Sequence, residues 1–318
     1  MNIFLETFSN FIQPSDTVIL AVSGGVDSMV LFDMVKKHYL REKIIVAHFD
    51  HSLRWVESDS DRELVANICK SENIICEVEK MDIRKIAKDE KNSLEAVARE
   101  RRYGFFHTVR EKYNARYILT AHHMDDQMET ILLWLMKWWK IRGLSGMSPL
   151  SGYIFRPFLG IKKSEILEYA QTNQIIYHED STNSDRGYAR NNIRHTLVPI
   201  LRSIEPSIDT MFMSLGEYMQ EASVYLESHI EKWLFESEKN SGKPYSFFSS
   251  TFTHESYFFQ REIISYLYAR AHNGSTQWLS RGGLDECIRF IREASNSHGV
   301  KEIKNLRLER RGERVYYL

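Results

Sequence analysis

The chain has 318 residues, of which 43% are hydrophobic and 27% are charged, and its formal net charge is −1. This length allows one large domain or two ordinary ones, and the composition is that of a soluble globular protein. The balanced charge excludes a globally basic nucleic-acid binder, although a local basic surface remains compatible with it. No apolar run is long enough to span a bilayer, and the N-terminus lacks the pattern of a signal peptide. We therefore expect a cytoplasmic protein.

The three cysteines predict neither a disulfide framework nor a metal site. Cys69, Cys76 and Cys287 contain no pair with the C-x-x-C spacing that a zinc ribbon or a redox pair requires. Reduced and mostly buried thiols are the expected state.

The first half of the chain alternates strand and helix patterns. In chain order, we predict a strand at 17–22, a helix at 27–39, a strand at 43–49, a helix at 57–71, a strand at 73–81, a helix at 92–113, a strand at 116–123, a helix at 124–138, an extended piece at 152–158 and a helix at 162–173. Short strands rich in Ile and Val, separated by helices, are typical of an α/β fold. We expect a doubly wound parallel sheet covered on both faces.

The second half has a different character. Residues 206–238 predict one long amphipathic helix, and a break over 241–250 precedes further helical patterns at 255–272 and 282–294. The tail over 301–318 alternates around Arg-Gly-Glu, which predicts a hairpin. We place the catalytic domain at 1–208 and a smaller, mostly helical domain at 209–318.

Polar segments follow three of the predicted strands: SGGVDS at 23–28, DHSLR at 50–54 and HHMDDQ at 122–127. Ligands of doubly wound sheets bind beyond the carboxyl ends of the strands, near the point where the strand order reverses. The three segments are therefore expected to converge on one site.

The segment SGGVDS has the composition of a phosphate-binding turn. Its glycines let the backbone approach a phosphate, and Ser23 and Ser28 add hydroxyl donors at the start of a helix. The lysine of the common phosphate loop is missing. Asp27 would repel phosphates unless a cation lies between them, and Mg²⁺ is the cation that suits a carboxylate. The alternative is a glycine turn in which Asp27 only caps the helix.

The segment HHMDDQMET places Asp125, Asp126 and Glu129 on one face of a helix. The helix dipole also stabilises carboxylates in the first turn, and this stabilisation is the structural alternative. Magnesium or a cationic substrate suits this set better than a zinc ion bound by histidine.

Two arginine clusters are candidates for phosphate contacts. Arg99, Arg101 and Arg102 lie on the helix at 92–113, where a solvated helix face is the alternative interpretation. The segment 178–201 carries Arg186, Arg190, Arg194 and His195, which predict a nucleic-acid surface or an ordinary surface loop.

Taken together, these motifs resemble the tRNA(Ile)-lysidine synthetase family of the PP-loop (N-type ATP pyrophosphatase) superfamily. The matching segments are Ser23–Ser28, Ala47–Arg54, Glu95–Tyr103, His122–Thr130, Arg156–Phe158, Asp180–Asn183 and Tyr188–His195. Two departures are a Lys-Trp-Trp-Lys-Ile segment at 137–141, where the family has a glycine-rich turn, and Asn192, where the family has an arginine. The second domain resembles the helical C-terminal domain of the family's shorter forms.

The resemblance implies a two-step reaction. ATP, with Mg²⁺, adenylates the C2 carbonyl oxygen of the wobble cytidine in the CAU anticodon of a tRNA(Ile), and pyrophosphate leaves. The amine of free L-lysine then attacks C2 and displaces AMP, which leaves lysidine. The implied partners are this tRNA, lysine and ATP, without a membrane. A homodimer and a tRNA-binding role for the second domain are also implied.

The resemblance also implies roles for individual residues. Ser23, Gly24, Gly25, Val26, Asp27 and Ser28 would hold the pyrophosphate of ATP, with Asp27 as the Mg²⁺ ligand; Ala47, His48 and Phe49 would flank the adenine; Arg102 and His122 would act near the nucleotide and the reaction centre; Asp126 and Glu129 would bind lysine and assist catalysis; Arg190 and Arg194 would contact tRNA or phosphates.

Three other functions are the alternatives to this one. A small-molecule PP-loop amidotransferase or ligase is one of them, but the segments at 122–130 and 189–195 do not suit it. A tRNA thiolase of the same superfamily commonly uses cysteine pairs, and this chain offers none with suitable spacing. A non-catalytic nucleotide-sensing or RNA-binding module would bind ATP without releasing AMP or pyrophosphate.

Overall fold

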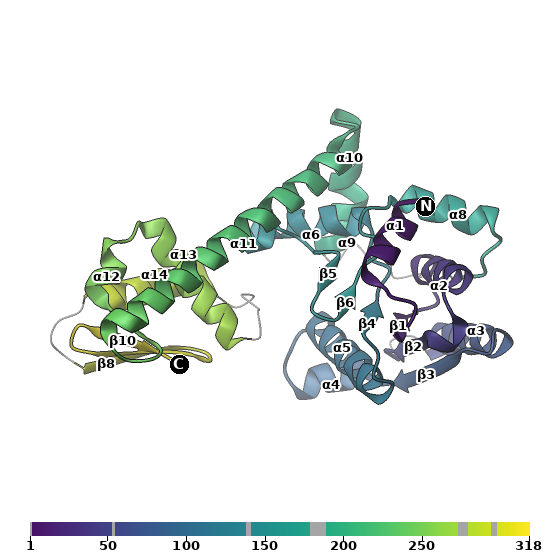
Figure 1. Ribbon diagram of the computed structural model, residues 1–318. Helices are drawn as coiled ribbons and strands as arrows, with labels where there is room; N and C mark the ends of the chain where they lie inside the picture. The colour runs from purple at the N-terminus through teal and green to yellow at the C-terminus, as the bar shows by residue number, and fades with distance from the viewer. Residues whose placement is uncertain (1, 53–54, 138–140, 179–188, 273–278, 294–297) are drawn as a thin grey trace. The chain divides into compact units, whose positions relative to one another are not determined.

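The computed structural model describes residues 2–52, 55–137, 141–178, 189–272, 279–293 and 298–318. The chain divides into two compact units, Met1–Glu217 and Tyr218–Leu318 (Figure 1). None of the described helices is both long and apolar enough to cross a membrane.

A six-stranded sheet forms the centre of the first unit. Its strands are β1 (Val18–Ala21), β2 (Ile44–Asp50), β3 (Ile75–Lys80), β4 (Tyr117–Leu119), β5 (Leu150–Ser151) and β6 (Ile154–Phe155), in the spatial order β3-β2-β1-β4-β6-β5. Every pairing is parallel except that of β5 with β6. The predicted parallel sheet is confirmed, and the strand order reverses beside β1.

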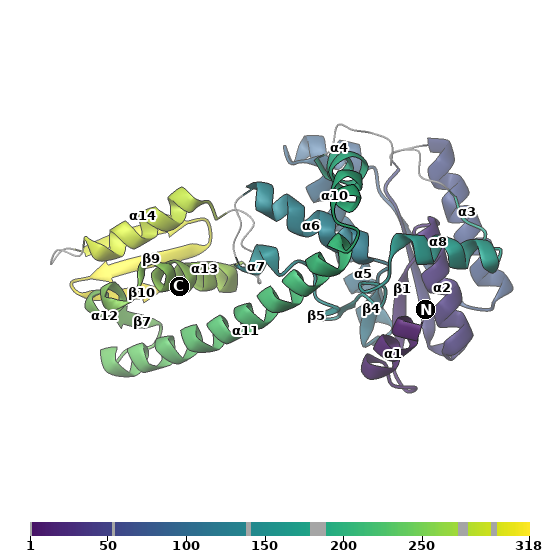
Figure 2. The same ribbon diagram turned by 90° about the horizontal axis from the view of Figure 1, so that it is seen from above.

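Helices cover both faces of this sheet. The described α-helices of the first unit are α1 (Asn2–Phe11), α2 (Val26–His38), α3 (Trp55–Ser71), α4 (Ile83–Asp89), α5 (Leu94–Lys112), α6 (Met124–Lys137), α7 (Ile141–Leu144), α8 (Lys163–Thr172), α9 (Ala189–Asn192) and α10 (Val198–Ile204). Figures 1 and 2 show α2 and α3 on the side of the sheet opposite α4 and α5. The sequence patterns did not predict α1 and α4.

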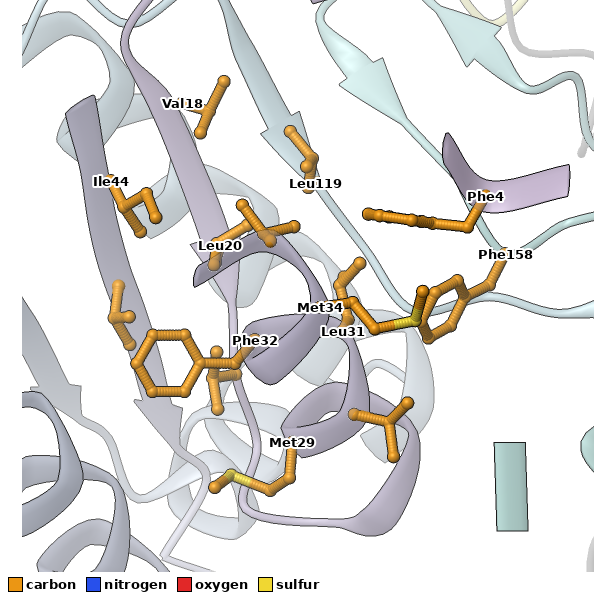
Figure 3. Packing of buried hydrophobic residues seen from close by; sticks show 14 of the residues in the cluster. Phe4, Val18, Leu20, Met29, Leu31, Phe32, Met34, Ile44, Leu119 and Phe158 are labelled. Atoms are coloured by element: carbon orange, nitrogen blue, oxygen red, sulfur yellow. The ribbon is translucent and has the colours of Figure 1, made fainter. Parts of the chain in front are cut away.

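Successive side chains of β1 and β2 point to opposite faces of the sheet and contribute to two separate hydrophobic cores. Val18 and Leu20 of β1 pack with Ile44 of β2 against α2, as Figure 3 shows. Ile19 and Ile45 point to the opposite face, where residues of α4 and α5 cover them. Successive side chains of a strand point to opposite faces, so strands that are apolar at every position need cover on both sides. This burial fixes the sheet edge that carries the polar loops.

The second unit combines helices with an antiparallel sheet. The helices are α11 (Ile208–Ser241), which begins in the first unit, α12 (Ser249–His254), α13 (Tyr257–Ala271) and α14 (Arg281–Arg292). The strands are β7 (Ser246–Phe248), β8 (His298–Ile303), β9 (Leu306–Arg311) and β10 (Arg314–Tyr317), in the order β7-β10-β9-β8. The long helix is confirmed, and so is the hairpin, which turns at Gly312 with a φ of +63°.

One prediction for this unit was wrong, and one predicted helix is confirmed with a boundary that differs by about two residues. The expected break at 241–250 contains β7, because this short segment pairs with β10, a partner about 70 residues away. The helix expected from residue 255 begins at Tyr257, because the Ser256 side chain caps it by accepting a hydrogen bond from the Phe259 N–H.

Candidate active site

The segment SGGVDS forms a tight turn between β1 and α2. Gly24 has a φ of +96°, a conformation that residues with a Cβ rarely adopt. Ser28 Oγ accepts a hydrogen bond from the Ser23 N–H at 3.1 Å and donates one to the Gly25 carbonyl at 2.9 Å. Gly25, which has no side chain, is the N-cap of α2, so the first N–H groups of the helix keep their capacity to bind an anion.

Asp27 lies in the first turn of α2 and is not the N-cap, so the capping alternative for this residue was wrong. One carboxylate oxygen accepts a hydrogen bond from the Lys163 ammonium, and the other lies 3.7 Å from His123 Nε2. Burial alone would raise the pKa of Asp27, but the contacts with His123 and Lys163 outweigh it and lower this pKa. Asp27 is therefore an anion at neutral pH.

His123 joins the phosphate turn to the start of α6. Its Nε2 lies 3.5 Å from Asp126 Oδ2, and its backbone N–H donates to the same oxygen at 3.0 Å. Burial opposes the charge on this imidazole, yet the two carboxylates Asp27 and Asp126 raise its pKa. Two of the three predicted loops thus meet at one buried histidine.

Glu129 and Asp126 accept hydrogen bonds from two arginines. Glu129, only 1% exposed, accepts from Arg190 Nε at 2.8 Å and from Arg194 Nε at 2.6 Å. Both arginines also lie within 3.4 Å of Asp126 Oδ1. The residues expected to bind a cationic substrate are thus paired with those expected to bind phosphates.

A π-helical turn, Ile193–Leu197, follows α9 and carries Arg194. Such turns widen a helix and are frequent at functional sites. Arg190 and Arg194, four residues apart on one helical face, both donate to Glu129.

Arginines surround His122. Burial, together with the charges of Arg156, Arg190 and Arg102, lowers the pKa of His122 to about 3, against the opposing effect of Asp126. Its Nδ1 lies 2.8 Å from Thr120 Oγ1. Burial also lowers the pKa of Arg102. Concentrated positive charge with little solvent favours an anionic ligand at this position.

The predicted adenine-flanking residues lie inside β2. Ala47 and Phe49 belong to the core beneath α4 and α5, with 0% and 6% exposure. His48 Nδ1 lies within hydrogen-bond distance, 2.9 Å, of the Val22 carbonyl oxygen, just after β1. The side chains of Ala47 and Phe49 therefore serve the core in this structure.

Of the other sequence candidates, Arg101 pairs with Glu90, away from this centre. Arg99 adjoins it, because Arg99 and Arg102 both lie over the Tyr103 ring. The segments 53–54, 138–140 and 179–188, which include Arg186, lie outside the described residues.

Sequence reasoning missed Asp61 and Lys163, which also shape the site, and it named Asp125 without its partners. Asp125 accepts hydrogen bonds from the Lys163 N–H at 3.2 Å and from Arg202 at 2.7 Å. Asp61 of α3 packs against Gly24 and lies 2.7 Å from His178 Nδ1. Lys163 had one signal in the sequence: a lysine in the first turn of a helix opposes the helix dipole and needs an anionic partner.

Fold, turn and strand order together define a PP-loop protein. A family model described as a PP-loop domain matches residues 2–201. Among solved structures, the U34-tRNA thiolase NcsA from Methanococcus maripaludis, with its [4Fe-4S] cluster, superposes with a TM-score of 0.55 at 15% identity. The match covers 70% of this chain and 77% of that one, and it supports the fold alone.

The chain belongs to the tRNA(Ile)-lysidine synthase family. It is 33% identical over 324 residues to the tRNA(Ile)-lysidine synthase of Bacillus anthracis, a match that covers 96% of this chain and 67% of the relative. The protein of the same name from Bacillus subtilis (strain 168) is 38% identical over 217 residues, which cover 67% of this chain and 46% of that relative.

Proposed function

We propose that this chain ligates free lysine to C2 of the wobble cytidine in the CAU anticodon of a tRNA(Ile), with conversion of ATP to AMP and pyrophosphate. The family supplies the reaction. The observation that supports it in this chain is His123, whose Nε2 lies 3.7 Å from Asp27 and 3.5 Å from Asp126. The turn, which is suited to phosphate, and the carboxylates, which are suited to a cation, thus both lie beside His123.

Two transfers make up the reaction. The C2 carbonyl oxygen attacks the α-phosphorus of ATP, and the electron pair of the broken bond leaves with pyrophosphate. The lysine amine then adds to C2, and AMP departs with the oxygen. Adenylation is needed because an unmodified carbonyl oxygen is a poor leaving group. The amine must lose a proton first, since a free lysine amine is charged at neutral pH.

Mg²⁺ fits the turn as a partner of ATP. Among the described residues, no group of three or more His, Cys, Asp and Glu side chains could hold a metal ion by itself. Asp27 offers an ionised carboxylate beside the start of α2, and Mg²⁺ commonly binds one or two carboxylates together with substrate phosphates. When bound, the ion would neutralise phosphate charge.

Asp126 and Glu129 hold the lysine in this proposal. Their oxygens already accept hydrogen bonds from Arg190 and Arg194, so the incoming amine must displace part of that pairing. The released arginines would then be available to phosphates of ATP or tRNA, which fits the role expected for them. Arg102 would meet the nucleotide, while His122, with its pKa of about 3, would act as a neutral imidazole.

The proposal includes the localisation and the oligomeric state of the enzyme. The enzyme acts in the cytoplasm, where its tRNA is found, and forms a homodimer, as the family resemblance implies. The second unit would bind tRNA. Sedimentation of the free chain tests the dimer, and removal of residues 242–318 tests the tRNA contact by its effect on tRNA affinity.

Incorporation of labelled lysine into a CAU-anticodon tRNA(Ile) transcript, with ATP, tests the function. We expect lysine-dependent release of AMP and pyrophosphate, and little product with the methionine tRNA that carries the same anticodon. If the protein is folded and binds ATP but does not incorporate lysine, the proposal is wrong. Sulfur transfer to tRNA in its place would favour the thiolase alternative.

A further inference from the structure

The turn at 23–28 contains no basic residue, yet a distant lysine reaches it. Lys163 Nζ donates a hydrogen bond to Asp27 Oδ1, across 136 residues of chain. Lys163 lies at the first position of α8, and its side chain is 32% exposed. The ammonium therefore stands at the edge of the turn and has access to solvent.

Two contacts with the start of α6 hold the segment that begins α8. The Lys163 N–H donates to Asp125 Oδ1 at 3.2 Å, and the Met124 N–H donates to the Ile161 carbonyl at 2.9 Å. Ile161 and Ile166, both 0% exposed, bury this end of α8 in the core that contains α2. Such burial fixes the Cα of Lys163, while its four-carbon stem lets the ammonium change partners.

Lys163 lies at the N-terminal end of α8, where the helix dipole disfavours a positive charge. A cation in the first turn opposes the helix dipole, so α8 gains nothing from this charge. The neighbouring Lys162 is exposed, whereas the ammonium of Lys163 contacts Asp27 in the phosphate turn. This difference indicates a role for Lys163 at the turn.

We propose that Lys163 supplies the cation that this phosphate turn lacks, by binding the β- and γ-phosphates of ATP and stabilising pyrophosphate as it leaves. The inference rests on the proposed function for its chemical step. As the bond between the α-phosphorus and the bridging oxygen breaks, the electron pair stays on pyrophosphate. The ammonium hydrogen-bonds this growing charge and keeps its proton.

The exchange of partners follows from the charges. In the absence of nucleotide, Asp27 is the anion that Lys163 meets. Asp27 would hold a Mg²⁺ ion that comes with ATP, and this ion would supply the counter-charge of the carboxylate. The three N–H donors of Lys163 Nζ would then be free for phosphate oxygens. Lys163 thus takes the role that a lysine within the phosphate loop has in other proteins, although it belongs to another helix.

The test compares Lys163→Met with the matched variant Lys162→Met, which removes the same charge one residue away. Calorimetry with pyrophosphate and Mg²⁺ needs neither tRNA nor lysine. We expect Lys163→Met to weaken pyrophosphate binding about 10- to 100-fold, as loss of a charge-assisted hydrogen bond does, and Lys162→Met to stay within about twofold of the wild type.

Exchange of labelled pyrophosphate into ATP, with tRNA but without lysine, tests the chemical step. The maximal rate should fall about 100-fold or more in Lys163→Met, and Lys163→Arg should recover part of it because it keeps a cation. Circular dichroism melting shows whether each variant is folded, and Lys163→Gln is the substitute if the methionine variant is not.

Two results would overturn the inference. One is pyrophosphate affinity of Lys163→Met within about twofold of the wild type. The other is a lower Mg²⁺ requirement with unchanged pyrophosphate affinity, which would mean that Lys163 only neutralises Asp27. A chain that fails to make lysidine but shows the pyrophosphate difference between the two lysine variants would refute the proposed function and leave the pyrophosphate-binding role of Lys163 standing.

Discussion

Arg194 donates two hydrogen bonds to Glu129, from Nε at 2.6 Å to Oε1 and from Nη2 at 3.0 Å to Oε2, although 65 residues separate the two. Glu129 is buried, and Arg190 adds a third hydrogen bond. A planar guanidinium matches a carboxylate in this two-point geometry better than an ammonium does. This pairing anchors the segment after residue 188 to the helix that follows β4.

Replacement of Arg194 by Met should destabilise the first unit by about 1–3 kcal/mol, because a buried carboxylate loses part of its compensation. Urea unfolding measures the change. In a double-mutant cycle with Glu129→Gln, we expect a coupling free energy of about 0.5–3 kcal/mol. Additive effects of the two substitutions would contradict the pairing.

Asp126→Asn should raise the KM for lysine about tenfold or more and leave tRNA adenylation within about twofold of the wild type, because the substitution removes a negative charge near the amine. Lysine incorporation at varied lysine concentration measures it. If the chemical step also collapses at saturating lysine, Asp126 assists deprotonation as well.

The adjacent Asp125→Asn is the matched control for Asp126→Asn. Asp125 accepts hydrogen bonds from the Lys163 N–H and from Arg202, contacts that hold α8 and α10 in place. We expect Asp125→Asn to lower the stability of the first unit while the KM for lysine changes less than in Asp126→Asn. Equal effects of both variants on the KM would count against a specific lysine contact by Asp126.

His51 should make the fold sensitive to acid. Burial and the charge of Arg102 lower the pKa of its imidazole from 6.5 to about 4, so the folded chain keeps it neutral where the unfolded chain binds a proton. Stability contributed in this way is complete above pH 6.5 and is lost as the pH falls towards 4, at up to about 1.4 kcal/mol per pH unit.

His51→Gln should therefore show a shallower loss of stability between pH 6.5 and 4 than the wild type, in urea unfolding at a series of pH values. His107→Gln, at a side chain that is 40% exposed, serves as the control for loss of a histidine. A parallel pH profile for His51→Gln and the wild type would be inconsistent with this account.

Gly146→Ala should cost more stability than Gly152→Ala. Both glycines have positive φ, +60° and +58°, so each alanine carries the left-handed backbone cost of about 1–2 kcal/mol. A Cβ at Gly146 would also lie 2.6 Å from the amide of Gln127, which is buried and hydrogen-bonded to Met147, whereas a Cβ at Gly152 meets nothing within 4 Å. Overpacking adds about 1–3 kcal/mol, measurable by urea unfolding.

Local patterns were enough to predict much of the fold. Ile- and Val-rich runs such as 43–49 favour a strand covered on both faces, and β2 adopts this structure. The same reasoning predicted that the turn after β1 and the helix after β4 meet at one edge. The stretch that contains β7 was missed, because a three-residue strand is decided by its distant partner and carries little pattern of its own.

From the sequence alone come the class of fold, the phosphate turn with its missing lysine, and the carboxylates that follow β4. Only the tertiary structure decided the distant partners: Lys163 beside Asp27, Arg194 beside Glu129, and His123 beside Asp27. The physical reason is range. Periodicity and turn chemistry act over a few residues, whereas these pairings depend on strand order and helix packing, which bring side chains more than 60 positions apart within hydrogen-bond distance.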